Sequence, residues 1–144
     1  MVALTAARNT PEALGVERTG TLGATQTIFN GSILMRNATG DLIKGVTATG
    51  AFGVGRAETA NVSVSAGVTV QRYRSGIFKF ANSTAGDLII KADIGAACFI
   101  VDDQTVAKTN GTNTRSPAGA IDAIDPDGSV WVRFDEALTR ALLS

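Results

Sequence analysis

The last third of this chain alternates short apolar runs with residues that favour turns. Asp125-Pro126-Asp127-Gly128 is the strongest of these turns, because Pro presets φ for a turn and Gly supplies a positive φ. The residues that follow it alternate apolar and polar at a period of two, which is typical of a strand with one buried face. This part of the chain predicts four short strands, at residues 97–101, 105–108, 119–124 and 130–134.

The middle of the chain has the same character. Residues 33–36 and 42–44 form a predicted hairpin whose turn contains Gly40. The stretch 48–56 is rich in glycine, which indicates a bulged strand or one that another backbone approaches closely. Further strands are predicted from the alternating valines at 62, 64, 68 and 70, with Gly67 as a break, and from residues 76–80 and 88–90.

The two ends of the chain lack this pattern. Residues 1–25 show no sustained period, so we expect an N-terminal arm that becomes ordered against a partner, or else a disordered tail. Residues 135–144 have helical spacing with Asp135 as a possible N-cap, so they form a short helix or an extended tail. The prediction is an all-β protein, a small barrel or sandwich spanning residues 26–134, with an arm before it and a tail or helix after it.

Composition supports one soluble domain of modest core size. Of the 144 residues, 44% are hydrophobic and 18% are charged, which argues against both disorder and a membrane-spanning chain. The N-terminus lacks a basic region followed by an apolar core, so we expect no secretory signal. Cys98 is the only cysteine and stands among apolar residues, so we expect a buried, unreactive thiol.

The net charge is zero, but the charges are unevenly distributed. Residues 1–80 carry eight basic and four acidic residues, and residues 81–144 carry five basic and nine acidic residues. The halves therefore have net charges of +4 and −4. This asymmetry is either a chance result on a solvated surface or a basis for head-to-tail contact between copies.

Residues with catalytic potential are sparse. The chain has no histidine, which removes the usual Ser-His and Cys-His pairs and the commonest metal ligand. Acidic residues cluster around Asp122, Asp125 and Asp127, but their spacing does not match a calcium-binding loop, and turn chemistry explains them better. We expect no catalytic, cofactor or metal site, and hence no enzyme.

Two binding functions are weaker alternatives. Arg72-Tyr73-Arg74 followed by Phe78, Lys79 and Phe80 suggests a surface for single-stranded nucleic acid, which the zero net charge disfavours. A receptor- or carbohydrate-binding module of a phage fibre or head fibre is the second, although 6% aromatic residues is little for sugar stacking.

Several short motifs carry a family resemblance. They are Gly76-Ile77-Phe78-Lys79-Phe80, Gly95-Ala96-Ala97-Cys98 leading to Asp102-Asp103, Ala118-Gly119, and Asp127-Gly128 before Val130-Trp131-Val132. In this order they resemble the small cement, or decoration, proteins of tailed-bacteriophage heads. The resemblance covers residues 77–134 best.

The resemblance implies a non-enzymatic structural virion protein without cofactors. Such a minor capsid protein is made in the bacterial host cytoplasm and binds the outer surface of the capsid, where it stabilises contacts between major capsid subunits. It also implies a trimer whose arms cross neighbouring subunits, without nucleic acid or membrane as partner. The expected contact residues on capsid or neighbouring copies are Leu4, Leu14, Val16, Leu22 and Trp131. For Trp131, packing in the barrel core or at a strand edge is the alternative.

Overall fold

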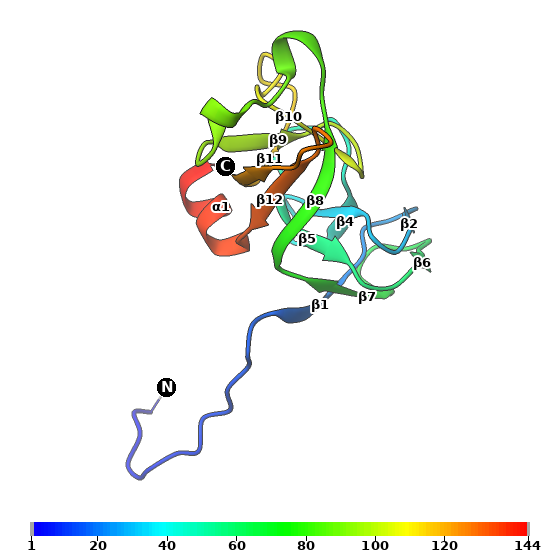
Figure 1. Ribbon diagram of the computed structural model, residues 1–144. Coiled ribbons are helices and arrows are strands. Elements are labelled where there is room, and N and C mark those ends of the chain that lie inside the picture. The colour runs from blue at the N-terminus through cyan, green and yellow to red at the C-terminus, as the bar shows by residue number, and fades with distance from the viewer. Residues whose placement is uncertain (1, 144) are drawn as a thin grey trace.

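The protein is an all-β fold in which strands make up 39% of the chain and helices 9%. The structure is a computed structural model and describes residues 2–143, so residues 1 and 144, at the ends of the predicted arm and tail, lie outside it. Figure 1 shows a body of strands with a short helix on its flank and an extended N-terminal segment that runs away from it. The all-β prediction is confirmed.

One sheet is formed by the first half of the chain. Its five strands are ordered β1-β7-β5-β3-β4, and they are β1 (Glu17–Thr21), β3 (Ile33–Arg36), β4 (Leu42–Lys44), β5 (Phe52–Ala57) and β7 (Val70–Arg74). The chain just after β1 returns to the far end of this sheet, where Leu22 bridges to Leu42 and the Gly23 amide donates to the Leu42 carbonyl at 2.8 Å. The sheet therefore curls until its two ends nearly meet. A two-stranded ribbon, β2 (Thr27–Ile28) with β6 (Asn61–Val62), projects beside it.

The second half of the chain forms a closed barrel. Its strands are ordered β10-β8-β12-β11-β9, and they are β8 (Gly76–Asn82), β9 (Ala97–Ile100), β10 (Thr105–Ala107), β11 (Pro117–Ile124) and β12 (Val130–Phe134). Two 3₁₀ turns, η1 (Ala85–Asp87) and η2 (Lys91–Asp93), connect β8 to β9. The helix α1 (Glu136–Leu143) follows β12, and the Asp135 carboxylate accepts a hydrogen bond from the Leu138 amide at 3.0 Å, so the predicted N-cap is present.

The curled sheet and the barrel share a wall. Leu34 packs in the core of the sheet with Leu22, Leu42 and Tyr73, whereas Ile33 and Met35 on the opposite face of β3 pack in the core of the barrel. Alternating side chains of one strand thus serve two cores, which is why all three residues are buried.

Glycine makes the close approach at this wall possible. A Cβ at Gly53 would lie 2.8 Å from the Ala118 Cα and would collide with the Ala118 carbonyl oxygen. A Cβ at Gly55 would collide in the same way with the Arg74 carbonyl oxygen. β5 also carries a bulge opposite Leu34 and Met35. The glycine-rich stretch is therefore a closely approached, bulged strand, as predicted.

The predicted boundary of the arm at residue 25 is wrong. β1 pairs with β7 from Glu17 to Thr21, and Leu22 is fully buried in the core of the sheet. β1 shows no apolar alternation because it contributes mainly backbone hydrogen bonds. At Gly20 the strand passes close to the Leu42 side chain, since a Cβ there would lie 2.9 Å from it. The extended segment comprises residues 2–16.

Two further predictions differ from the structure. Residues 88–90 are no strand but lie between the two 3₁₀ turns, where Ile89 is buried while Leu88 and Ile90 are exposed. Val62 ends the short strand β6, Val70 begins β7, and Val64 and Val68 lie between these strands, yet all four are exposed. Ser63, between Val62 and Val64, is buried, so the alternation holds locally, but no other element of the described chain covers the valines.

Candidate functional site

The N-terminal arm, residues 2–16, is the most exposed part of the chain. Residues 2–14 are all exposed, and Leu14 exposes 96% of its surface. The arm is tied to the body at its base, where the Ser75 amide donates to the Val16 carbonyl at 3.0 Å and the Arg18 Nε to the Gly15 carbonyl at 3.0 Å. Fully extended, residues 2–14 reach about 45 Å. A domain of this size has a radius of gyration of about 14 Å, so the arm can reach a neighbouring molecule.

The predicted contact residues fall into three groups. Leu4, Leu14 and Val16 are exposed on the arm, so they are available to a partner. Leu22 is not, because it fills the core of the curled sheet, and its assignment to an interface is corrected. Trp131 lies partly exposed on the outside of the barrel, opposite the buried Val130 and Val132. Its indole Nε1 donates to the Asp125 carboxylate at 3.2 Å, and the Lys79 ammonium lies 6.0 Å from the ring centroid.

A polar network joins the curled sheet to α1. Glu136, at the start of the helix, accepts a hydrogen bond from the Tyr73 hydroxyl at 2.7 Å and another from the Arg36 Nε at 2.7 Å. Arg36 also donates to the Tyr73 hydroxyl at 2.8 Å. Burial, followed by the bond to Glu136, raises the pKa of Tyr73 to about 12. Burial acts to lower the pKa of Arg36, but the hydrogen bond and the negative charge of Glu136 raise this pKa overall. The three residues are distant in sequence, and no local pattern indicated the network.

The basic residues near β7 are largely paired. Arg74 contacts Glu17 at 2.7 Å, and Arg72 lies 3.8 Å from the same carboxylate. Tyr73 points to the opposite, buried face and Phe80 lies in the barrel core, so these aromatic rings are not available to stack on bases. Phe78, the third ring of the predicted surface, is half-buried, and the Arg56 guanidinium lies over it at 4.2 Å from its centroid. The arrangement therefore leaves few exposed rings beside unpaired positive charge, which disfavours a single-strand site.

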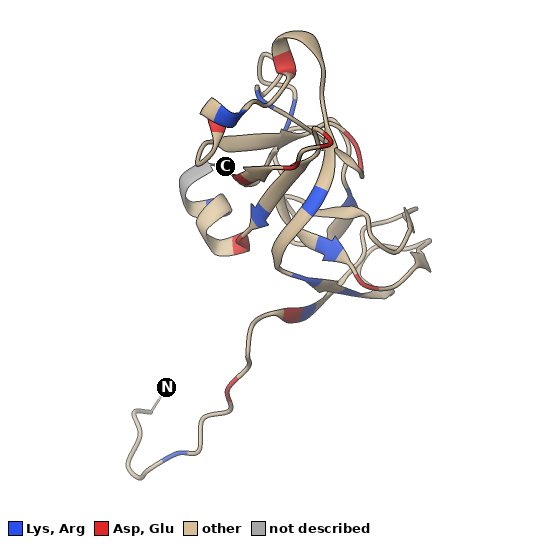
Figure 2. Ribbon diagram, viewed as in Figure 1, with Lys and Arg blue, Asp and Glu red and all other residues tan. Residues whose placement is uncertain are grey.

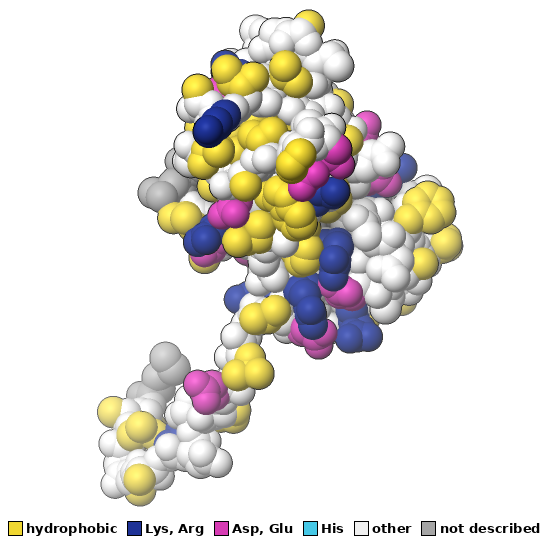
Figure 3. Space-filling model, in the orientation of Figure 1, with side chains coloured by type: hydrophobic (Ala, Val, Ile, Leu, Met, Phe, Trp, Pro, Cys, Tyr) yellow, Lys and Arg dark blue, Asp and Glu magenta, His cyan; other side chains and the backbone are white. Residues whose placement is uncertain are grey.

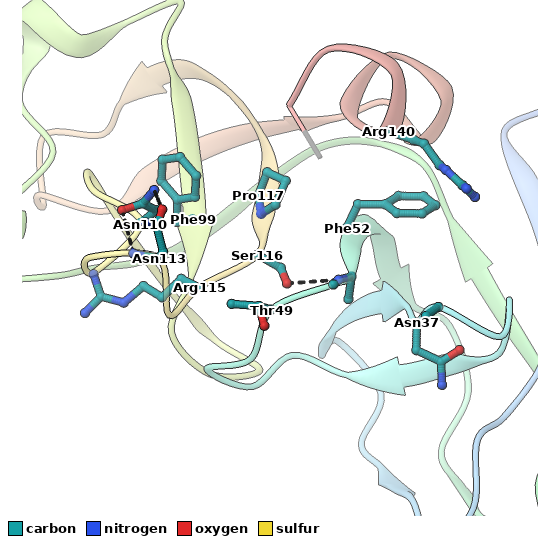
Figure 4. A pocket seen from close by; sticks show the side chains of 13 residues that line it. Asn37, Thr49, Phe52, Phe99, Asn110, Asn113, Arg115, Ser116, Pro117 and Arg140 are labelled. Carbon is teal, nitrogen blue, oxygen red and sulfur yellow. Dashed lines mark hydrogen bonds between the residues drawn. The ribbon is translucent and has the colours of Figure 1, made fainter.

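A pocket of about 440 Å³ lies between the curled sheet, the barrel and the loop before β11. Figure 4 shows Phe99, Pro117 and Phe52 along it, with asparagines from two loops at either end. Its polar groups are largely engaged: Asn110 and Asn113 bond to each other, and Ser116 bonds to the backbone at Ala48 and Ala51. The described residues that line it include no carboxylate or thiol to form a nucleophile–base pair.

The other candidates for chemistry have structural roles. Cys98 is buried in the barrel, and burial raises the pKa of its thiol to about 12. The predicted turn is present, with the Gly128 amide donating to the Asp125 carbonyl at 2.9 Å. Hydrogen bonds from Ser129 lower the pKa of Asp127 to about 2. Within residues 2–143, no three acidic or cysteine side chains are placed to hold a metal ion.

Comparison with known protein families, with curated proteins and with solved structures finds no match for this chain. Among the described residues, no helix has both the length and the apolar character needed to cross a membrane. The arm and the exposed apolar surfaces of the body are the parts of the described chain that are most accessible to a partner.

Proposed function

We propose that this chain is a non-enzymatic structural virion protein that binds the outer surface of a phage capsid and stabilises contacts between major capsid subunits. The observation that carries the proposal is the arm. Residues 2–14 are exposed, yet they carry large apolar side chains at Val2, Leu4 and Leu14. The motif resemblance supports the same role and adds a homotrimeric state and synthesis in the bacterial host cytoplasm.

The physical argument rests on conformational entropy. Ordering a chain costs roughly 1–2 kcal/mol per residue, and the exposed arm makes few contacts that offset this cost. Burying a Val or Leu side chain contributes roughly 1.5–3 kcal/mol, so a neighbouring surface that accepts these side chains and pairs with the backbone would order the arm. A closely packed body with a long arm can thereby link two capsid subunits.

The proposal is tested by removing residues 2–14 and mixing the truncated protein with heads assembled without it. We expect the truncated protein to fold, because the arm lies outside both cores, but to sediment poorly with heads and to leave their rupture temperature low. The matched control is a full-length variant with Arg8→Ala and Glu12→Ala, which keeps the arm length and its apolar side chains and should bind normally. Equal binding and stabilisation by the truncated and full-length proteins would show that the arm does not link capsid subunits.

A further inference from the structure

Two chain segments at one end of the body carry no charged residues, although Asp41 and Asp103 of neighbouring segments lie close to them. Residues 19–35 and 59–71 contain no Lys, Arg, Asp or Glu, although 18% of the whole chain is charged and these 30 residues would carry about five charges at that rate. The two segments fold together, because β2 pairs with β6 and the Leu22 amide donates to the Thr69 carbonyl at 2.8 Å. In Figure 2 the β2–β6 ribbon has no coloured segment.

This end also exposes large apolar side chains. Phe29, Val62, Val64, Val68 and Val70 expose between 58% and 80% of their surfaces. We call these five residues the tip. Figure 3 shows hydrophobic side chains among uncharged ones where the ribbon projects.

Strand register and backbone hydrogen bonds place the tip residues at the same end of the body. Thr27 pairs with Val62, so Phe29, two residues further along, lies on the same face as Val62. Ser63 points inward, where its hydroxyl donates to the Gly23 carbonyl at 2.7 Å, so its neighbours Val62 and Val64 point outward. The Asn61 side chain lies 3.4 Å from the Val70 carbonyl, which brings the start of β7 beside β6.

The exposed apolar area of the tip is close to the apolar area of one side of a standard interface. Its exposed apolar area is on the order of 500 Å², taking about 200 Å² for a whole Phe side chain and somewhat less for each Val. One side of a standard interface buries about 800 Å², of which roughly 56–65% is apolar. The tip therefore supplies about the apolar share that a stable contact needs.

The absence of charge favours a second copy of the chain as the partner. A residue close to a rotation axis faces its own copies, so any charge there would meet a charge of the same sign. Like charges in contact cost several kcal/mol, and a surface on such an axis is therefore best left uncharged. Elsewhere on the body, by contrast, many charged residues lie at the surface, and several of them pair with opposite charges of the same chain.

We propose that the tip is the surface through which copies of this chain associate around a rotation axis. This inference deepens the self-association included in the proposed function, but it does not depend on binding to a capsid. In this arrangement the arm, which joins the body at the opposite end of β1 from the tip, remains available to contact a capsid.

The test is the oligomeric state of the full chain in solution, measured by sedimentation equilibrium up to about 100 μM, a concentration that detects contacts far weaker than typical specific ones. Val64→Asp and Val64→Lys each place a like charge next to its copies, and each should raise the dissociation constant at least about 100-fold. An equal mixture of the two variants should associate more tightly than either variant alone, because every mixed assembly, dimer or trimer, contains more opposite-charge pairs than like-charge pairs. Val64 is 80% exposed, so both variants should fold, which circular dichroism checks.

Ile94→Asp is the matched control, an equally drastic change at an exposed apolar residue of the barrel. It should leave self-association unchanged. A monomeric wild-type chain, or Val64 variants that associate as the wild type does, would overturn the inference. Failure of the mixture to associate more tightly than either variant alone would overturn the placement of the tip on the axis. Binding to heads is measured separately, so loss of the arm's role and loss of the tip's role give different results.

Discussion

Gly53 provides a sharp test of how the two halves of the body are joined. Replacing it with alanine places a Cβ 2.8 Å from the Ala118 Cα and against the Ala118 carbonyl oxygen. The colliding atoms are all backbone, so no side chain can turn aside to make room. β5 and β11 must move apart by several tenths of an ångström, which also loosens the shared wall at β3.

The magnitude follows from the cost of overpacking. Extra methyl groups in a packed core cost typically 1–3 kcal/mol, and the rigid backbone here places Gly53→Ala near about 3 kcal/mol. The unfolding entropy is about 2.1 cal/mol/K per residue, or about 0.27 kcal/mol/K for a body of roughly 130 residues. The expected decrease in Tm is therefore about 10 °C.

Differential scanning calorimetry of the full chain measures this decrease. Gly86→Ala is the matched control, because no atom lies within 4 Å of its added Cβ. That substitution should leave Tm unchanged or raise it slightly, since alanine restricts the unfolded chain. A Tm for Gly53→Ala within about 2 °C of the wild type would refute the close approach of β5 and β11.

Three further predictions concern buried polar groups. Tyr73 is the only tyrosine, so ultraviolet absorbance should follow its ionisation, with a pKa of about 12 in the folded protein and about 10 in denaturant. Because folding raises this pKa, the protonated Tyr73 hydroxyl contributes fully to stability below pH 10, and this contribution is lost as the pH rises towards 12. Chemical denaturation should therefore show a smaller loss of unfolding free energy between pH 10 and 12 in Tyr73→Phe than in the wild type. Glu136→Ala leaves Tyr73 and Arg36 without their shared acceptor and should lower the free energy of unfolding by about 2 kcal/mol, whereas Glu12→Ala on the exposed arm should not change it. Cys98 should react with a thiol reagent only as fast as the protein unfolds, and rapid labelling of the native protein would contradict its burial.

Local sequence determined the strands that have both an alternating pattern and a defined turn. The hairpin of β3 and β4 and the strand β12 have the predicted bounds, because side-chain alternation and turn residues act within a few positions of each other. The N-cap of α1 at Asp135 and the burial of Cys98 follow from equally local preferences. These features identified an all-β chain.

Tertiary structure decided which faces are covered. β1 is a strand only because β7 supplies its hydrogen-bonding partner, and Leu22 is buried only because the sheet curls back onto β4. The valines of the tip alternate as a buried strand would, yet they are exposed because no other part of the described chain reaches them. Arg36, Tyr73 and Glu136 meet across up to 100 residues of sequence. An alternating pattern states that a strand has two different faces, but only the packing of distant segments determines which face meets protein and which meets solvent.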